Sequence, residues 1–320
     1  MEILKWTLIF IVSIASVIKF ADLFTNASEK IGTHFKIPPF IIGVTIVALG
    51  TSLPEIATAV ISVMQNHSEM VIGNAVGSNI ANILLVLGIT AIVAKELKVN
   101  KDIMGIDLPI MLGSTILLYI TTLDGKFTYI DGTLTLLTLV IYVLYNVKSH
   151  RKIEPKVEKD IKEISKEEKK EKLHITQPLI VIGASIGLYF AADYAITSVV
   201  KISEILNIAK ELVAISAVAL GTSLPELAVS VVAARNGKAD LAIGNVTGSN
   251  IINALAIMGI PSFIGPLTIS PDMIQFAIPT LSIVTILYMF VTMDKTISKW
   301  EGMTMVIIYV AFIGKTFNIL

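Results

Sequence analysis

The chain has 320 residues, of which 54% are hydrophobic and only 16% are charged, and its formal net charge is zero. Soluble globular proteins carry about 25% charged residues, so this composition argues against a water-soluble protein. Cysteine is absent, which excludes disulfide bonds and thiolate metal sites. No cofactor, no enzymatic activity and no nucleic-acid partner are expected; the lipid bilayer is the expected surrounding.

Apolar runs of about 20 residues, long enough to cross the hydrocarbon core of a bilayer, recur along almost the whole chain. We expect ten membrane-spanning helices and an all-α membrane protein, because the runs are too long and too continuously apolar for barrel strands. The first run is kept as a span and not removed as a signal peptide, since it lacks an Ala-x-Ala-like cleavage site. The predicted spans cover residues 3–21, 39–64, 70–94, 103–122, 129–147, 178–200, 211–234, 240–264, 273–292 and 302–319.

Two segments of the first half reappear in the second half. Residues 50–55 and 221–226 both read Gly-Thr-Ser-Leu-Pro-Glu, and residues 77–80 and 248–251 both read Gly-Ser-Asn-Ile. All are separated by the same offset (226 − 55 = 171), so no insertion or deletion separates the copies over this stretch. The chain is therefore predicted to be a duplicated five-helix unit.

The predicted units are residues 1–147 and 175–320, joined by a charged linker at 148–174. Because five is odd, the second unit enters the membrane from the opposite side, which gives two inverted five-helix repeats of the kind used by secondary transporters.

The basic residues predict the orientation in the membrane. In the linker, Lys and Arg alternate with acids, and the positive-inside bias places this segment in the cytoplasm as a solvated tether. Loops on the same side are also rich in lysine, for example at Lys95, Lys98 and Lys101. Both termini then lie outside the cell membrane, and we expect the multi-pass protein to act as a monomer.

Two glutamates lie about midway along predicted spans. A carboxylate near the middle of a membrane helix costs roughly 2.5–3.5 kcal/mol on insertion scales, so Glu55 and Glu226 suggest a function. Each follows a Thr-Ser pair and a proline. Proline leaves the carbonyl four residues earlier without its helical donor, which frees the oxygens of Gly50 and Gly221. Freed carbonyls that line a cavity are good ligands for hard cations.

The next span of each half adds oxygen donors on one helix face. Ser78 and Asn82 are four residues apart, and so are Ser249 and Asn253. Together with the glutamates, this set contains carboxylate, hydroxyl and amide oxygens but no imidazole or thiol. Such a set suits sodium, magnesium or calcium better than zinc or copper. One calcium or two sodium ions would neutralise two carboxylates, so the set is compatible with exchange of one for the other.

Structural roles compete with these assignments. Gly77 and Gly248 also suit close helix packing. For Asn74 and Asn245, the sequence leaves two roles open: hydrogen bonding at a helix end, or support of the ligands of the site. Acids near predicted helix ends are expected at the membrane interface: Asp22, Asp107, Asp124, Asp131 and Asp193.

At residues 50–55 and 221–226, together with the two Gly-Ser-Asn-Ile segments, the chain resembles the sodium/calcium exchangers of the calcium/cation antiporter (CaCA) superfamily. The resemblance covers essentially the full length. It implies that calcium and sodium are the transported ions, and that helices one and six slide across the other eight to open the site to alternate sides. The implied metal-binding residues, in which the alanines contribute backbone oxygens, are Ala48, Thr51, Ser52, Glu55, Ser78, Asn82, Ala219, Thr222, Ser223, Glu226, Ser249 and Asn253.

Asn253 departs from many members of this family, which have Asp there, so potassium dependence is not expected. The nearest alternative is a proton-coupled calcium/cation exchanger, in which a buried Glu55 or Glu226 carries protons. An intramembrane aspartyl-type protease and a passive channel are weaker alternatives. The protease lacks support because no Gly-x-Gly-Asp-like segment occurs in the chain.

Overall fold

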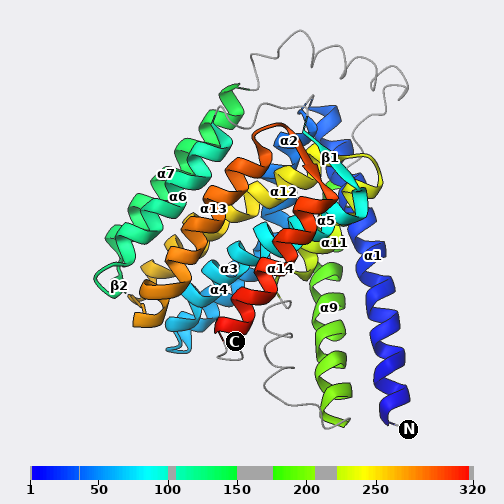
Figure 1. Ribbon diagram of the computed structural model, residues 1–320, viewed down its shortest axis with the longest axis horizontal. Helices are drawn as coiled ribbons and strands as arrows, with labels where there is room; N and C mark the ends of the chain where they lie inside the picture. Colours follow the sequence, from blue (N-terminus) through cyan, green and yellow to red (C-terminus); the bar gives the residue numbers. More distant parts are fainter. Residues whose placement is uncertain (1, 36, 100–105, 150–175, 206–221, 317–320) are drawn as a thin grey trace.

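The structure is a computed structural model that describes residues 2–35, 37–99, 106–149, 176–205 and 222–316, with no side chains described at 147–149. It is almost entirely helical (Figure 1). Most of the predicted linker and the candidate ligand Ala219 lie outside the described residues.

In the first half, the helices follow the predicted runs, and two of them contain a π-helical turn (η). Their bounds are α1 Glu2–His34, α2 Pro39–Ile42, η1 Gly43–Val47, α3 Ala48–Met64, α4 Glu69–Ala81, η2 Asn82–Val86, α5 Leu87–Ala94, α6 Asp107–Thr122 and α7 Tyr129–Ser149.

The second half repeats this order within its described residues. Its elements are α9 Thr176–Ile205, α11 Leu224–Arg235, α12 Ala239–Ile252, the π-turn η3 Asn253–Ile257, the short 3₁₀ helix η4 Pro261–Phe263, the π-turn η5 Met273–Ala277, α13 Ile278–Thr292 and α14 Lys299–Thr316.

Seven helical segments of the described chain are long and apolar enough to cross a bilayer, and α6 is a shorter apolar helix. The protein is thus a helical, multi-pass membrane protein. The first predicted span, 3–21, is too short: α1 continues to His34. Its extension includes polar residues, but Thr25 and Ser28 are fully buried against the rest of the molecule, so they do not face lipid.

Two short antiparallel ribbons join the halves. Strand β1 (Glu96–Lys98) pairs with β4 (Thr296–Ser298), and β2 (Lys126–Phe127) pairs with β3 (Leu267–Thr268). The ribbons lie at opposite ends of the molecule (Figure 1). Each therefore ties an end of one half to the other half.

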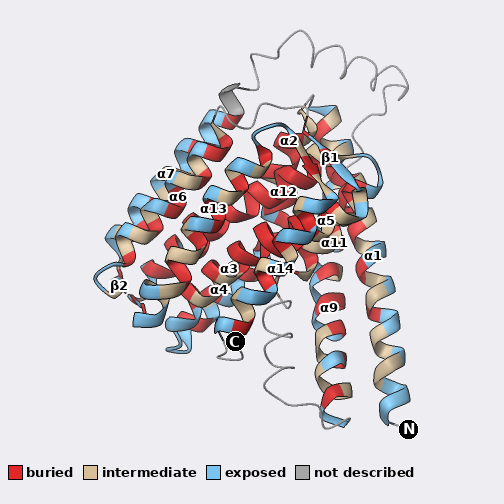
Figure 2. Ribbon diagram, in the orientation of Figure 1, coloured by how far each residue is buried: buried red, intermediate tan, exposed pale blue. Residues whose placement is uncertain are grey.

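The core is built around α12 and its neighbours. All residues of the most apolar window within Ala239–Phe263 are buried, whereas only 22% of the corresponding window of α1 and 28% of that of α9 are buried. These two helices pack against each other at one edge of the molecule, and their lower parts carry many exposed residues (Figure 2).

Glycines allow α12 to cross η1 closely. A Cβ atom on Gly248 would lie 2.5 Å from the backbone oxygen of Val44, and one on Gly43 would lie 2.5 Å from that of Leu241. The prediction of close packing is confirmed for Gly248. For Gly77, a Cβ would meet no atom of the described residues within 4 Å.

The acids expected at the interface divide into two groups. Asp124 and Asp131 accept hydrogen bonds in the turn before α7, from the backbone nitrogens of Lys126 and Thr128. Asp107, in contrast, is only 1% exposed, although it begins α6. Its side chain lies inside the protein, where the hydroxyl of Tyr142 donates a hydrogen bond to it at 2.9 Å.

Candidate ion-binding site

The two glutamates of the repeated motif are buried in the core of the molecule. Glu55 lies in α3 and is 2% exposed; Glu226 lies in the first turn of α11 and is 1% exposed. Their carboxyl groups are near enough to interact electrostatically, and the side chain of Thr51 lies beside Glu226. The structure therefore brings together the two acids that the sequence places 171 positions apart.

The prolines act differently in the two halves. Pro54 lies inside α3, which continues on both sides of it, whereas Pro225 occupies the start of α11 after a turn at Thr222 and Ser223. The carbonyl of Gly50 accepts a hydrogen bond from the hydroxyl of Ser185 on α9, at 3.1 Å. One of the two lone pairs of this oxygen is therefore used by a side chain of the other half. Gly221 lies outside the described residues.

The predicted amide ligands begin π-turns. Asn82 is the first residue of η2, and Asn253 is the first residue of η3. A π-turn inserts one extra residue into a helix and is frequently found at functional sites. Both halves thus contain the same irregularity at the same position of the repeat.

Hydrogen bonds connect candidate ligands across the two halves. The hydroxyls of Ser78 and Thr222 lie 3.0 Å apart. The hydroxyl of Thr51 donates to the side-chain oxygen of Asn245 at 3.3 Å. The nitrogen of Asn245 donates in turn to the hydroxyl of Ser230, at 3.0 Å, and to the backbone oxygen of Glu226, at 3.4 Å.

Of the two roles that the sequence leaves open for Asn245, these contacts favour support of the site over hydrogen bonding at a helix end. It is fully buried inside α12, away from the helix ends, and it holds Thr51 and the Glu226 segment together. Asn74 has a smaller role, since its oxygen accepts a hydrogen bond from Ser78 at 3.4 Å. Ser230 and Ser185 had no motif that distinguished them in the sequence.

Many candidate ligands hold buried polar atoms without a hydrogen bond. Such atoms are rare in folded proteins, because each carries an uncompensated desolvation cost of about 1–3 kcal/mol. Among the described candidate ligands, these atoms are Ser52 Oγ, Glu55 Oε2, Asn82 Oδ1 and Nδ2, Ser223 Oγ, both Oε atoms of Glu226, Ser249 Oγ and Asn253 Oδ1. Their concentration around two carboxylates fits a site that takes up cations.

The donor set points to hard cations. Within the described part of the chain, no group of three or more His, Cys, Asp or Glu residues could hold a metal ion. The arrangement therefore relies on two carboxylates supplemented by neutral oxygens, which suits sodium and calcium.

A second buried polar network lies outside this site, and sequence reasoning missed it. The hydroxyl of Tyr288 in α13 lies 2.7 Å from that of Thr247 in α12, and Tyr142 in α7 donates to Asp107 in α6. Nothing in the apolar pattern distinguishes these residues. One pair joins α12 to α13 two residues before Ser249, and the other joins α6 to α7.

Comparisons with known proteins agree with this architecture. A family model described as "Sodium/calcium exchanger protein" matches residues 5–148 and 176–317. The inner membrane protein YrbG of Escherichia coli is 32% identical over 83% of this chain and 82% of its own. The sodium/calcium exchanger MaX1 of Methanosarcina acetivorans is 29% identical over 98% of both chains.

A solved structure of the sodium-calcium exchanger NCX_Mj superposes with a TM-score of 0.80 at 30% identity, over 98% of this chain and 99% of that one. The family match covers most of the chain and both motif copies. The protein therefore belongs to the sodium/calcium exchanger family of the calcium/cation antiporter superfamily.

Proposed function

We propose that the protein exchanges calcium for sodium by alternating access, at a buried acidic site between its two halves. The observation that carries this proposal is the pair of buried glutamates, Glu55 and Glu226, which come from corresponding positions and lie close together with unbonded oxygens. Two close negative charges in a dry site repel each other, so the empty, ionised site is unfavourable. One calcium or two sodium ions would neutralise it.

The ligands of this site are the twelve metal-binding residues that the family resemblance implies, including Ala219. Ser78 and Thr222 belong to different halves, and their contact supports a single shared site in place of two separate ones. The Cβ of Ala48 lies against α12, since a Cβ on Gly248 would be 2.7 Å from it. The first-half segment thus faces the helix that bears Ser249 and leads to Asn253.

The two halves are inverted repeats, and the ribbons support this. The repeat relates β1 to β3 at the offset of 171 (267 − 96 = 171), and β2 to β4 at an offset one residue shorter (296 − 126 = 170). Exchanging the halves therefore converts the ribbon β1–β4 into the ribbon β3–β2. Because these ribbons lie at opposite ends of the molecule, the exchange also reverses its direction (Figure 1). A site at the centre of such an arrangement can be reached in equivalent ways from both sides of the membrane.

Ten crossings, with the linker in the cytoplasm and both termini outside, complete the proposal. The view in Figure 1 supports this, since α1 begins at the lower end and α7 ends at the upper end. The same arrangement places the turn between α11 and α12 on the cytoplasmic side.

Reconstitution in liposomes distinguishes sodium from proton coupling. A sodium gradient imposed without a pH gradient is expected to drive calcium uptake, and collapse of the sodium gradient should stop it. Uptake that ignores sodium and follows an imposed pH gradient would instead favour the proton-coupled exchanger. Heat released on titrating calcium into the purified protein, and its suppression by sodium, would show that both ions compete for one site.

A further inference from the structure

The turn between α11 and α12 holds one end of α1. The ammonium group of Lys238 lies 2.5 Å from the carboxylate of Glu29 and donates to the side-chain oxygen of Asn26 at 2.9 Å. The side-chain nitrogen of Asn236 donates to Asp22 at 3.3 Å. The three α1 residues follow a spacing of four and three, so they lie along one face of the helix.

The ion pair is partly withdrawn from solvent. The side chains of Lys238 and Glu29 are 19% and 33% exposed. A pair at this depth is screened less by salt and water than a fully exposed pair. By comparison, the ion pair Lys201–Glu204 at the other end of the neighbouring helix α9 has side chains that are 45% and 44% exposed.

The corresponding turn of the first half has the same backbone but makes no such contact. Asn66 and Gly237 both have positive φ angles, 62° and 76°. The nitrogen that follows each bonds back to the preceding helix, from His67 to Ser62 and from Lys238 to Ala233. Yet His67 stands where the second half has Lys238.

The partner helix of that turn also lacks the complementary groups. In α9, the counterpart of Glu29 is Val200 (200 − 29 = 171), and the counterpart of Asp22 is Asp193, which is exposed. No hydrogen bond or ion pair joins the described residues of α9 to the turn at 65–67. The molecule is therefore held at one of two equivalent places.

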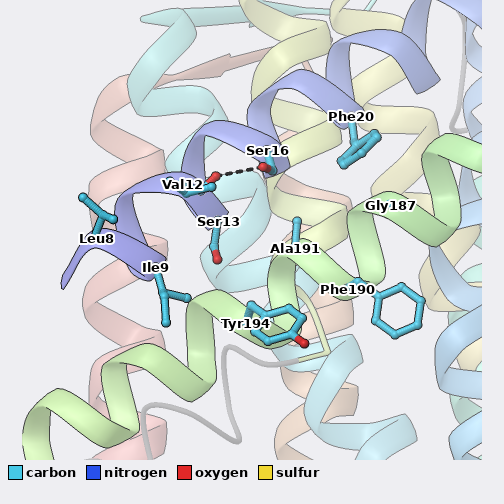
Figure 3. A pocket seen from close by; sticks show the side chains of 10 residues that line it. All are labelled: Leu8, Ile9, Val12, Ser13, Ser16, Phe20, Gly187, Phe190, Ala191 and Tyr194. Atoms are coloured by element: carbon cyan, nitrogen blue, oxygen red, sulfur yellow. Dashed lines mark hydrogen bonds between the residues drawn. The ribbon is translucent and has the colours of Figure 1, made fainter. Parts of the chain in front are cut away.

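The held part of α1 covers the candidate site. Phe24, which lies between Asp22 and Asn26 in the sequence, is fully buried and packs on Gly50. A Cβ atom on Gly50 would lie 2.5 Å from the ring of Phe24. Gly50 begins the segment that carries Glu55. Farther from the turn, a pocket of about 460 Å³ lies between α1 and α9, lined by Val12 and Ser16 on one side and Ala191 and Tyr194 on the other (Figure 3).

We propose that Lys238 is a positioning residue of the transport cycle, which holds the Asp22–Glu29 part of α1 over the site and keeps the site closed on that side. The proposal rests on the alternating access described above. Opening the site toward the linker side requires this latch, defined as Lys238 with Glu29 and Asn26, to release α1.

A buried reporter on α1 tests the latch directly. The chain has no cysteine, so Ser28→Cys places a single thiol on the held segment, where Ser28 is fully buried. Labelling by a membrane-impermeant maleimide is measured in inside-out vesicles. Lys238→Glu and Glu29→Lys are each expected to raise the labelling rate about tenfold, as a loss of 1.4 kcal/mol would. The double exchange Lys238→Glu with Glu29→Lys should restore slow labelling.

The matched control is Lys201→Glu, which also breaks an ion pair but away from the turn, and should leave the rate unchanged. Unaltered labelling in both single variants, or a double variant that stays fast, would overturn the proposal. Restoration by the double variant excludes misfolding as the cause of faster labelling. Labelling needs no ion gradient, so it tests the latch separately from transport. If the labelling rates change as expected but sodium does not drive calcium uptake, the proposed exchange is refuted while the contact between Lys238 and α1 is supported.

A reversible crosslink tests whether release is required for transport. In a Glu29→Cys, Lys238→Cys variant, a bifunctional thiol reagent with a cleavable bridge is expected to stop calcium uptake, and a reducing agent should restore it. In each single-cysteine variant, calcium uptake after the same treatment should equal the uptake of that variant before treatment. Uptake by the crosslinked protein at the untreated rate would show that α1 need not leave the turn.

Discussion

The side-chain nitrogen of Asn79 donates a hydrogen bond to the backbone oxygen of Asn250, at 3.1 Å. The two residues are counterparts in the repeat (250 − 79 = 171), so the contact lies where the halves meet. The hydroxyls of Thr115 and Thr285, which lie 3.4 Å apart, come from the matching helices α6 and α13 in the same way. Contacts of this kind join corresponding parts of the two halves. The following predictions test whether the two motif copies form one ion-binding site.

Removing either buried charge should abolish calcium transport. Glu55→Gln and Glu226→Gln each halve the negative charge that replaces the water shell of the ion. We expect calcium affinity to fall at least tenfold, about 1.4 kcal/mol, in isothermal titrations and in liposome uptake. Glu69→Gln, at an exposed position that begins α4, is the control and should behave as the unmodified protein. Unchanged affinity in both site variants would remove the proposed site.

A third carboxylate should change the competition between sodium and calcium. Asn253→Asp adds a charge at the start of η3, where the side-chain oxygen is buried and unbonded. We expect tighter calcium binding and a different sodium concentration for half-inhibition of uptake. Asn82→Asp, at the counterpart position, should shift both quantities in the same direction. If sodium dependence is identical in Asn253→Asp and the unmodified protein, Asn253 is not a ligand.

Asn245 should matter for both stability and binding. Asn245→Ala removes the buried partner of Ser230 and the link from Thr51 to α12, which is expected to cost about 1–3 kcal/mol of folding free energy. Calcium affinity should fall as well, because Thr51 is no longer held beside Glu226. Thermal unfolding in detergent and calcium titration measure the two effects. Gln65→Ala, in an exposed turn, should alter neither.

The close crossing of α12 and η1 predicts a steric effect. Gly248→Ala places a methyl group 2.5 Å from the backbone oxygen of Val44, which cannot move aside as a flexible side chain could. We expect a loss of about 1–3 kcal/mol in stability, seen as a lower unfolding temperature. Gly183→Ala is the matched control, because a methyl group there meets no described atom within 4 Å. Within the helix α9, it should be neutral or slightly stabilising.

The sequence was most informative where the physical constraint is local. The length of each apolar run predicts a helix, and the repeated Gly-Thr-Ser-Leu-Pro-Glu motif predicts which acids meet, because equivalent segments of a duplicated unit occupy equivalent places. The sequence was less informative where packing between helices determines the position of a residue. The extension of α1 beyond residue 21 is too polar to be recognised as a span, and only its burial against other elements explains it.

The same limit applies to two single residues. Proline chemistry correctly identifies Gly50 O as a carbonyl without its helical donor, but the position of Ser185 beside it depends on how α9 packs. Asp107 was expected at the interface because it begins a helix, and its partner Tyr142 belongs to the next helix. Both outcomes depend on contacts between helices that no local pattern describes.

The exchanged pairing of the ribbons has a consequence for biosynthesis. Strand β1 leaves the ribosome first, and its partner β4 follows about 200 residues later (296 − 96 = 200). The first half must therefore wait in the membrane with an unsatisfied strand edge until the residues of β4 have been made. Assembly of this protein is thus a late, post-insertion event, and a ribosome that stalls before residue 296 would release a chain whose two halves cannot yet be joined at that end.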